Sequence, residues 1–447
     1  MGFPLSLDTP IAHPGPLPAE ADVVVIGAGI IGVMTAWELA RAGLRVVVLE
    51  KGRVAAEQSS RNWGWIRQQG RHPAELPIMI EANRLWRDLA ARLGDGLGLR
   101  QAGVVYLASG PGDEAKHAAF LQLARDHGLD TEAFSRADLA RVLPGAVGGW
   151  TGGIRTASDM HAEPAQAVPL LARAAAADGV VIVEHCAVRL IDVAGGRVAG
   201  AITEQGRIRA PAVVVAGGAW SSLLLRRHGI VIPQLAVRAT VAATVPLPAV
   251  TEGAVADNRL GWRRRQDGGY TLGPDAFHQF HIGPDAFRHL RAYLPTLMQD
   301  FRHTSFLPVA PQGYPDGWRT PRRWSGEGPS PFEALRVLNP APHMPVVAQM
   351  ARDLAATYPD LGEVRIARAW SGMIDTMPDV VPVIDHAPSL PGLTIATGMS
   401  GHGFGIGPAF GRIVAALVQG HETGHDLHAF RFSRFSDGTR IDAGAGM

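Results

Sequence analysis

Apolar and polar positions follow two different periods near the start of the chain, and they predict a strand, a helix and a second strand. Residues 22–26 form a short apolar, β-branched run, which is typical of a strand buried on both faces. Apolar residues then recur at helical spacing from Ile31 to Ala42, and Gly43 ends this pattern. Residues 45–49 repeat the strand signal. The segment is therefore predicted to be a βαβ unit.

The same two patterns recur further along the chain. They predict helices at residues 78–93, 164–177 and 345–357, and strands near residues 180–185, 188–193 and 198–203. Residues 213–227 and 393–420 each repeat a strand, a glycine loop and a helix. Residues 230–370 lack this rhythm and are richer in Pro, aromatic residues and Arg, which predicts a separate antiparallel-sheet domain.

Composition narrows the classes of protein that the chain can belong to. Its 447 residues are 47% apolar and 19% charged, as in an ordinary folded protein of two domains. A net charge of +1 gives no electrostatic reason to expect a nucleic acid or an acidic membrane surface as partner. The single Cys186 excludes an internal disulfide. With no signal peptide pattern and no apolar run of about 18 residues, we expect a cytoplasmic protein without a membrane span.

The glycine loop GAGIIG opens the first helix. Gly27 permits a tight turn, Gly29 lets the backbone approach a pyrophosphate, and Gly32 lets helix and strand pack closely. Glu50, at the end of the second strand, can accept hydrogen bonds from a ribose. The loop lies between a strand and a helix and is followed by an acid, so it predicts dinucleotide binding rather than an empty turn.

The segments group into two predicted domains in an α/β chain (α+β overall). Residues 1–20 are an extended lead. A nicotinamide enzyme usually has its glycine motif followed by an uninterrupted series of βα units, whereas here VVVAGGAW and TGMSGHGFGIGP return far downstream, which suggests segments gathered around one large cofactor, FAD. Residues 21–75, 150–229 and 366–435 are then predicted to form a Rossmann-like FAD-binding domain of discontinuous segments, and residues 76–149 and 230–365 the antiparallel-sheet substrate domain.

Five motifs resemble those of the D-amino acid oxidase superfamily of FAD-dependent enzymes. Within this superfamily they are most similar to the branch of the sarcosine oxidase β-subunits and dimethylglycine dehydrogenases. They are GAGIIG, RNWGWIR, VVVAGGAWS, WSGMIDTMPDVVPVID and GMSGHGF, and the resemblance covers roughly residues 20–435. It implies one non-covalently bound FAD. The residues that it assigns to the cofactor are Gly27, Gly29, Ile30, Ile31, Gly32, Glu50, Lys51, Ser59, Ser60, Arg61, Asn62, Trp63, Val188, Ala216, Gly217, Trp220, Gly372, Gly398, Gly401, His402, Gly403, Phe404 and Gly405.

The resemblance also implies residues for chemistry and substrate binding. Arg67 and His402 would lie near the flavin ring, where a cation or a helix N-terminus stabilises the reduced, anionic form. Trp63 and Trp65 either line an apolar substrate pocket or pack in the core. Tyr270 either faces that pocket as a catalytic and substrate-binding residue or packs.

Three positions depart from the family pattern. Ile374 stands where an arginine would bind a substrate carboxylate, so such binding falls to Arg67, Arg259 or an arginine of residues 263–265, although that run also fits a solvated strand edge. Gly405 and Thr271 stand where related oxidases have lysines. Both oxidase and dehydrogenase activity, with O2 or another electron acceptor, therefore stay open.

Other candidate groups have weaker support. His161 lies near the position at which some β-subunits link a second flavin covalently, but its neighbours match poorly. His278 and His281 have metal-ligand spacing on a predicted loop without further ligands, so no metal is expected. Cys186 fits a small core residue rather than a nucleophile.

The leading functional hypothesis is oxidation of the C–N bond of an amine or amino acid to an imine by hydride transfer to FAD. The missing arginine and the two tryptophans favour a bulky or aromatic, weakly anionic substrate over glycine or sarcosine. Two alternatives are an FAD-dependent 2-hydroxy-acid dehydrogenase and a flavin-binding subunit of a larger complex, since the chain could be an oligomer or need a partner subunit.

Overall fold

A six-stranded sheet forms the centre of one half of the molecule. The computed structural model describes residues 5–275, 277–300 and 304–441. Strands β1 (Val23–Ile26), β2 (Val46–Leu49), β9 (Val181–Val183), β13 (Ala212–Val215) and β22 (Leu393–Thr397) are parallel, and β21 (Val383–His386) joins the edge antiparallel. The strand order is β21-β22-β13-β1-β2-β9.

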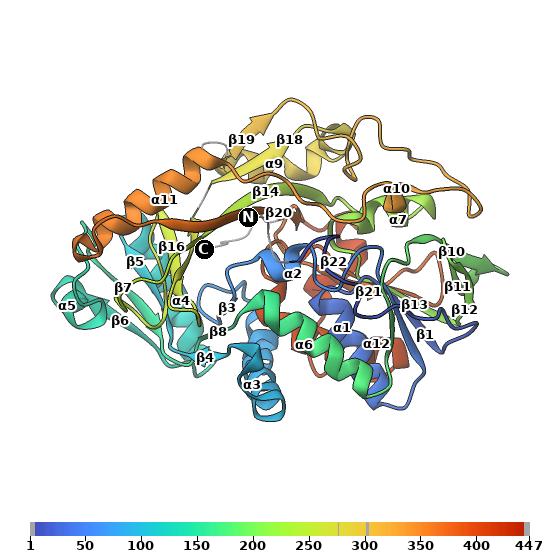
Figure 1. The fold of residues 1–447 in the computed structure, drawn as a ribbon, viewed down its shortest axis with the longest axis horizontal. Helices are drawn as coiled ribbons and strands as arrows, with labels where there is room; N and C mark the ends of the chain where they lie inside the picture. Colours follow the sequence, from blue (N-terminus) through green and yellow to red (C-terminus); the bar gives the residue numbers. More distant parts are fainter. Residues whose placement is uncertain (1–4, 276, 301–303, 442–447) are drawn as a thin grey trace.

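Both faces of this sheet are covered, which explains its continuous apolar runs. Val23 and Val25 face α1 (Ile30–Arg41), α3 (Leu76–Leu93), α6 (Pro164–Ala177) and α12 (Gly403–Gln419). Val24 and Ile26 face α7 (Ser221–Arg227) and a small meander of β10 (Val188–Ala194), β11 (Arg197–Thr203) and β12 (Gly206–Arg209). Figure 1 shows the helices on one side of the sheet and the meander on the other.

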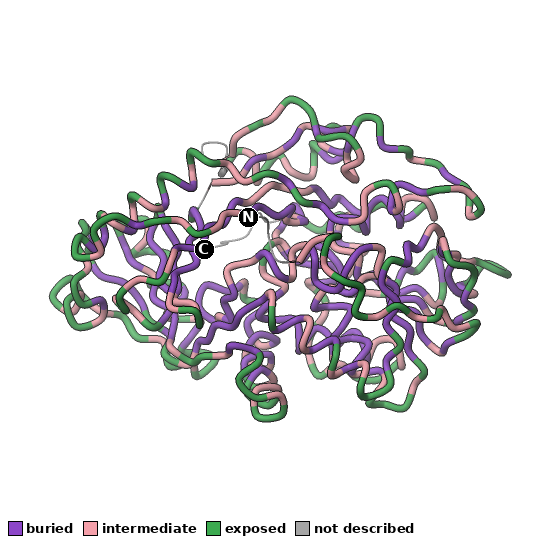
Figure 2. The backbone as a smooth tube through the Cα atoms, viewed as in Figure 1, coloured by how far each residue is buried: buried purple, intermediate pink, exposed green. Residues whose placement is uncertain are grey.

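A ten-stranded, mostly antiparallel sheet forms the other half. Its strands are β5 (Val104–Ala108), β6 (Thr131–Ser135), β7 (Gly152–Thr156), β14 (Leu235–Thr244), β15 (Ala254–Ala256), β16 (Leu260–Arg264), β17 (Tyr270–Pro274), β18 (His278–His281), β19 (Thr304–Leu307) and β20 (Ile366–Thr376). Helix α11 (Met344–Thr357) packs on its outer face, so that the opposite face is turned toward the first half (Figure 1). Buried backbone runs through both halves (Figure 2).

Shorter elements complete the fold. Strands β3 (Trp65–Ile66), β4 (Arg100–Gln101) and β8 (Met160–His161) form a three-stranded sheet in the order β3-β8-β4. The remaining α-helices are α2 (Gln58–Arg61), α4 (Pro111–Asp126), α5 (Leu139–Val142), α8 (Pro284–Arg288), α9 (Leu290–Asp300) and α10 (Pro331–Ala334).

The predicted elements occur close to their predicted bounds, but three segments lie in the half of the molecule opposite to the domain that their residues were assigned to. Helix α3 packs with α1 and α12 rather than with the substrate domain, because Met79 and Trp86 complete the core beneath the parallel sheet. Strands β7 and β20, predicted within the FAD-binding domain, hydrogen-bond to β5 and β14 of the larger sheet. Each lies at a point where the chain passes from one half to the other.

The N-terminal lead is attached to the half with the parallel sheet. The Glu184 carboxylate accepts hydrogen bonds from the backbone N–H groups of Ala12 (2.6 Å) and His13 (3.0 Å). The Arg53 guanidinium donates to the carbonyls of Leu7 (3.1 Å) and Thr9 (2.7 Å). Across the described ranges, no helix has both the length and the hydropathy that a membrane crossing requires.

Candidate functional site

A cavity of about 1290 Å³ lies between the two sheets. The carboxyl ends of β1, β2 and β13 form one wall, and β14 with the end of β17 forms the opposite wall. Pockets for drug-sized ligands measure about 300–1,000 Å³, so this cavity has room for a larger ligand. In open α/β sheets ligands bind outside the carboxyl ends of the strands, which is where the cavity lies.

The glycine loop and the start of α1 form the floor of the cavity. Gly27 has a φ of +105°, which favours glycine, and a methyl group on Gly32 would collide with the Gly27 carbonyl. The backbone N–H of Ile30 donates to Ser59 Oγ at 2.9 Å. The first turn of α1 carries no acidic side chain, so its N–H groups present a positive helix end to the cavity.

Glu50 and Lys51 lie at one end of the cavity. The Glu50 carboxylate accepts hydrogen bonds from the N–H groups of Ala28 (2.9 Å) and Gly52 (2.7 Å), and burial raises its pKa. Lys51 Nζ pairs with Glu57 at 2.9 Å and lies 4.2 Å from the centre of the Trp220 ring. Lys51 is therefore already neutralised, whereas Glu50 keeps acceptor capacity for a hydroxyl group.

Most residues assigned to the cofactor line this cavity. They are Gly27, Gly29, Ile30, Ile31, Glu50, Lys51, Ser59, Arg61, Asn62, Trp63, Val188, Ala216, Gly217, Trp220, Gly372, Gly401, His402, Gly403, Phe404 and Gly405. Gly32 acts one layer below, in the packing of α1 on the loop.

Besides Gly32, three predicted site residues lie away from the cavity wall. Ser60 is buried in α2, where its hydroxyl bonds to the Glu57 carbonyl. Gly398 donates its N–H to the buried Asp375 carboxylate at 2.8 Å. Tyr270 is fully buried among the residues under α11, and its hydroxyl donates to the Pro248 carbonyl at 3.1 Å. Because side chains alternate along β17, Tyr270 points away from the cavity, and its assignment to the substrate site is wrong.

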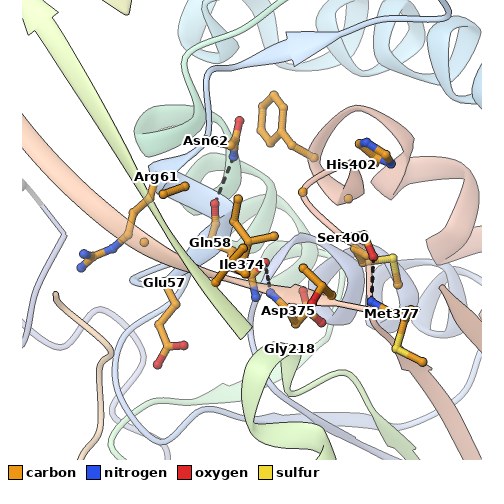
Figure 3. Close-up of a pocket in the computed structure, with 18 of the residues that line it drawn as sticks. Glu57, Gln58, Arg61, Asn62, Gly218, Ile374, Asp375, Met377, Ser400 and His402 are labelled. Atoms are coloured by element: carbon orange, nitrogen blue, oxygen red, sulfur yellow. Dashed lines mark hydrogen bonds between the residues drawn. The ribbon is translucent and has the colours of Figure 1, made fainter. Parts of the chain in front are cut away.

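Arg61 and Asn62 brace the loop that follows β2. The buried Arg61 guanidinium donates to Asn339 Oδ1 (2.7 Å) and to the Ser371 carbonyl (2.8 Å). The Asn62 side-chain amide donates to the Gln58 carbonyl at 3.1 Å (Figure 3). Gln58 Oε1 in turn accepts from the backbone N–H of Asp375, which joins the loop to β20.

Helix α12 begins at the cavity, with His402 at its N-cap. Its first turn carries no acidic residue, so it presents a second positive helix end. A Cβ atom on Gly405 would lie 3.0 Å from the Trp65 carbonyl and from Ile66 Cα, closer than side chains normally pack, so a lysine there would require β3 or α12 to shift. The Trp86 indole donates to the Gly405 carbonyl at 2.8 Å. Close packing of α12 on β3 therefore explains the glycine at this family position.

These features fit the predicted flavin dinucleotide. Two helix N-termini without acidic residues face one cavity, which suits a pyrophosphate and an anionic reduced ring. The buried Nδ1 of His402 and Nε1 of Trp65, on the cavity wall, have no hydrogen-bond partner in the described structure. Buried polar groups normally have hydrogen-bond partners, so these two nitrogen atoms indicate that a polar ligand binds in the cavity.

Three aromatic side chains line the part of the cavity next to the larger sheet. Trp63 and Trp65 meet edge to face, with ring centres 5.3 Å apart, and Trp65 lies 6.3 Å from Tyr106. All three line the cavity, which supports the pocket interpretation of the tryptophans. Tyr106 was not predicted, because its strand β5 lies in a region without a family motif. Ile374 also lines the cavity and adds an apolar contact.

The structure distinguishes between the candidate carboxylate-binding arginines. Arg259 pairs with Asp257 at 2.9 Å, Arg263 with Glu163 at 2.8 Å, Arg264 with Glu252 at 3.7 Å, and Arg265 with Asp267. Arg67 lines the cavity, stacks 5.6 Å from the centre of the Tyr106 ring, and makes no ion pair within the described residues. Arg263 is 1% exposed, so a solvated strand edge does not describe it.

A buried ion pair behind His402 was missed. Arg71 Nη1 lies 3.5 Å from Glu75 Oε2, and Arg71 Nη2 donates to the His402 carbonyl at 3.2 Å. Glu75 Oε2 lies 3.7 Å from His402 Nδ1. Burial, together with the neighbouring arginines, holds the pKa of His402 well below its usual value, while burial raises the pKa of Glu75. An Arg and a Glu four residues apart before a predicted helix were the available signal.

Of His161, His278, His281 and Cys186, only His278 lines the cavity. His161 is buried in β8 outside the cavity wall, and burial, with Arg263 nearby, lowers its pKa to about 3. His278 and His281 lie on strand β18 rather than on a loop, and residues three apart on a strand point to opposite faces. No group of three or more His, Cys, Asp or Glu side chains is placed to hold a metal ion in the described part of the chain. Cys186 is a buried core residue.

Comparisons with known proteins agree with this geometry. The family described as "DAO: FAD dependent oxidoreductase" matches residues 22–417. The L-amino acid deaminase of Proteus myxofaciens, solved in complex with anthranilate, is 30% identical with a TM-score of 0.90, over 95% of this chain and 96% of that one.

Two curated relatives show how coverage varies. Mitochondrial sarcosine dehydrogenase of Homo sapiens is 30% identical over 237 residues, which are 51% of this chain and 26% of that protein. The chain therefore spans about a quarter of that relative. The sarcosine oxidase β-subunit of Rhizobium meliloti is 26% identical over 96% of this chain and 92% of its own.

Proposed function

Because the chain belongs to the family of FAD-dependent oxidoreductases, we propose that it oxidises the C–N bond of an α-amino acid with a large apolar or aromatic side chain. The product is an imine, which water then hydrolyses. One observation carries this proposal: Arg67 lies without a described carboxylate partner beside three aromatic rings, in the cavity that holds both helix N-termini. A guanidinium in such a place is a strong site for a carboxylate.

FAD in this cavity would accept the hydride from the carbon beside the substrate nitrogen. The start of α1 would hold the pyrophosphate, and Glu50 would accept a hydrogen bond from a ribose hydroxyl. The start of α12, with His402, offers positive potential at the opposite part of the cavity. The apolar walls formed by Trp65 and Ile374 would exclude water from the reacting carbon.

The substrate would be held at its two ends. Arg67 would bind its carboxylate, the role of the family arginine at whose position this chain has Ile374. Trp63, Trp65 and Tyr106 would contact its side chain, and aromatic faces also attract an ammonium group by about 0.5–2 kcal/mol. The Proteus myxofaciens deaminase was solved with anthranilate, an aromatic carboxylate, which supports this class of substrate.

The branch within the family and the electron acceptor are finer proposals. Similarity to the Rhizobium meliloti subunit supports the predicted β-subunit branch, and similarity to the deaminase supports a branch acting on primary amino acids. Thr271 and Gly405 in place of lysines favour an electron acceptor other than O2. FAD reduced under anaerobic conditions should then be reoxidised faster by a quinone than by air. The cytoplasmic location stays a prediction.

The test compares molecules that share one side chain. Phenylalanine of both hands, phenethylamine, phenyllactate and sarcosine are mixed with the enzyme without oxygen, and stopped-flow absorbance follows the rate of flavin reduction. We expect one hand of phenylalanine to react fastest. Arg67→Met should lower the rate constant of flavin reduction, divided by the half-saturation concentration of phenylalanine, by about 10- to 160-fold, as the loss of a charge-assisted bond of about 1.5–3 kcal/mol implies. Phenethylamine should be affected little.

The alternatives predict other outcomes. His402 lines the cavity, and its Nδ1 has no hydrogen-bond partner among the described residues, so it is the group best placed to accept a proton from an alcohol. Burial and the neighbouring arginines hold its pKa low, which weakens it as a base. Rapid reduction by phenyllactate would favour the hydroxy-acid hypothesis. A flavin that no compound reduces, in a chain that copurifies with a second polypeptide, would favour the subunit hypothesis. Sarcosine as the best substrate by a wide margin would contradict the proposed class.

A further inference from the structure

Two glycines face each other on neighbouring strands of the cavity wall. Gly261 of β16 is paired with Gly273 of β17 in the antiparallel register. Side chains alternate along these strands, so Leu260 and Leu272 point to the α11 side, and the glycine positions point to the cavity side. Glycine weakens a strand interior and often marks a close approach of another group.

The group that approaches is the Trp63 indole. A Cβ atom on Gly261 would lie 2.5 Å from Cζ3 of Trp63, and one on Gly273 would overlap Cε2 and Cζ2 of the same ring. Carbon atoms in contact normally stay about 3.5–4.0 Å apart. The ring therefore lies across both glycines, and neither position can carry a side chain while Trp63 stays where it is.

The backbone of Trp63 is held in place from the other side. The Arg263 guanidinium donates through Nε to the Trp63 carbonyl and makes two hydrogen bonds to the Glu163 carboxylate, at 2.8 and 3.1 Å. Gly64 has a φ of +83°, and a Cβ atom there would collide with the Ala162 carbonyl. A methyl group on Gly273 would therefore move the ring rather than the loop, and the free side of the ring is the cavity.

We propose that the Gly261–Gly273 pair determines substrate size, because it lets the Trp63 indole lie against the sheet instead of filling the pocket. This inference rests on the proposed function, since Trp63 is there one wall of the side-chain pocket. Neither glycine touches the substrate, but together they determine which substrate side chains fit the pocket.

The test uses Gly273→Ala, Trp63→Leu and the double variant. Gly273→Ala should lower kcat/KM for phenylalanine at least about tenfold relative to alanine, the range that small changes in an apolar pocket produce. Trp63→Leu, which introduces no clash, should shift the preference toward larger side chains. In the double variant the smaller leucine side chain that replaces Trp63 leaves room for the new methyl group, so phenylalanine activity should return. An equal loss for both substrates, or no recovery, would overturn the proposal.

A second measurement needs no turnover. Phenylacetate and acetate are titrated into the flavin-loaded protein, and their dissociation constants are read from the flavin absorbance. Gly273→Ala should weaken phenylacetate and leave acetate unchanged. If no amino acid reduces the wild-type flavin, the proposed function fails while this titration still tests the glycine pair. If Gly273→Ala does not fold, Gly261→Ala and Trp63→Leu are compared with the wild type in the same titration. Unchanged selectivity between phenylacetate and acetate in both variants would overturn the proposal.

Discussion

Glu75, the N-cap residue of α3, lies four residues after Arg71 and places a buried carboxylate beside His402. Its Oε2 is 3.7 Å from His402 Nδ1, and its Oε1 has no partner among the described residues. Burial raises the pKa of Glu75 and lowers the pKa of Arg71 to about 10, and the attraction between the two groups opposes both shifts. This pair sets the charge behind the start of α12.

Glu75→Gln should raise the midpoint potential of the bound flavin. The substitution leaves Arg71 as an unbalanced cation 3.2 Å from the His402 carbonyl, and positive charge favours the anionic reduced ring. We expect a rise of about 30 mV, which corresponds to about 1.4 kcal/mol for a two-electron couple. A spectroscopic redox titration measures it. Glu81→Gln, in α3 itself, is the control, since Glu81 pairs with Arg412 away from the cavity wall. A fall in potential would contradict this role.

His161 makes stability depend on pH. Burial lowers its pKa in the folded state to about 3, whereas an unfolded histidine has a pKa of about 6.5. Between these values the unfolded chain binds a proton that the folded protein does not, so stability falls as pH falls through this window.

His161→Gln should remove this contribution. As the pH falls from about 7.5 to about 5, the wild type should lose about 2 kcal/mol more unfolding free energy than the variant does. Urea unfolding at both pH values measures the change. The exposed His127→Gln should show no such change of slope. An equal slope in wild type and His161→Gln would mean that His161 is protonated in the folded protein.

At the scale of single residues, most of the residues that the motifs assigned to the cofactor line the cavity, whereas Tyr270, assigned to the substrate, does not. The glycine loops carry their own geometric reason, so Gly27 and Gly29 could be assigned from spacing alone. Tyr270 could not, because which face of β17 is buried depends on α11, a helix much later in the chain. Arg67 became a clear candidate only when the structure paired the other arginines with carboxylates.

At the scale of elements, the βαβ unit and the helices followed directly from apolar periodicity. Their bounds moved by a few residues at most, and α6 coincides with the predicted range 164–177. Periodicity does not say which sheet a strand joins, so the residues of β7 and β20 were assigned to the FAD-binding domain, although both strands pair within the larger sheet. The partner of β20 is β14, which lies far earlier in the chain, so that only the folded structure reveals the pairing.

The glycines of the first loop should separate folding from cofactor binding. A methyl group on Gly32 would meet the Gly27 carbonyl, backbone against backbone, so Gly32→Ala should lower the unfolding free energy of the apoprotein by about 1–3 kcal/mol. Gly29 has an extended conformation (φ −72°), which any residue adopts, and its Cβ would meet only Ser59 Oγ, at 3.0 Å.

Gly29→Val should accordingly keep the apoprotein stable, within about 0.5 kcal/mol, but abolish FAD binding, because the side chain would occupy the pyrophosphate position. Chemical unfolding of apoprotein and the flavin content after reconstitution give the two readouts. Full flavin content in Gly29→Val would contradict the dinucleotide interpretation of the loop.

At the scale of the whole molecule, the ligand cavity lies between the two halves, and its walls come from segments spread over most of the chain. Residues from Ile26 to Gly405 line it. The sequence indicated that several glycine loops gather around one cofactor, but the distance between the sheets is set by core packing of both halves. A ligand that contacts both walls should therefore stabilise both halves of the folded protein together.

Removing FAD should lower the thermal stability of the entire protein, and adding it back should restore it. Free FAD at about 100 times its dissociation constant stabilises the folded state by about 2.7 kcal/mol when the unfolded chain does not bind it. His161 and Cys186 lie outside the cavity wall, so we expect no covalent link through them. Acid precipitation should therefore leave the yellow flavin in the supernatant. The apoprotein should then unfold at a lower temperature, with a midpoint that rises with added FAD, while Gly29→Val should not respond. Flavin retained on the precipitate, or a midpoint independent of FAD, would show that the cavity does not hold the cofactor as we propose.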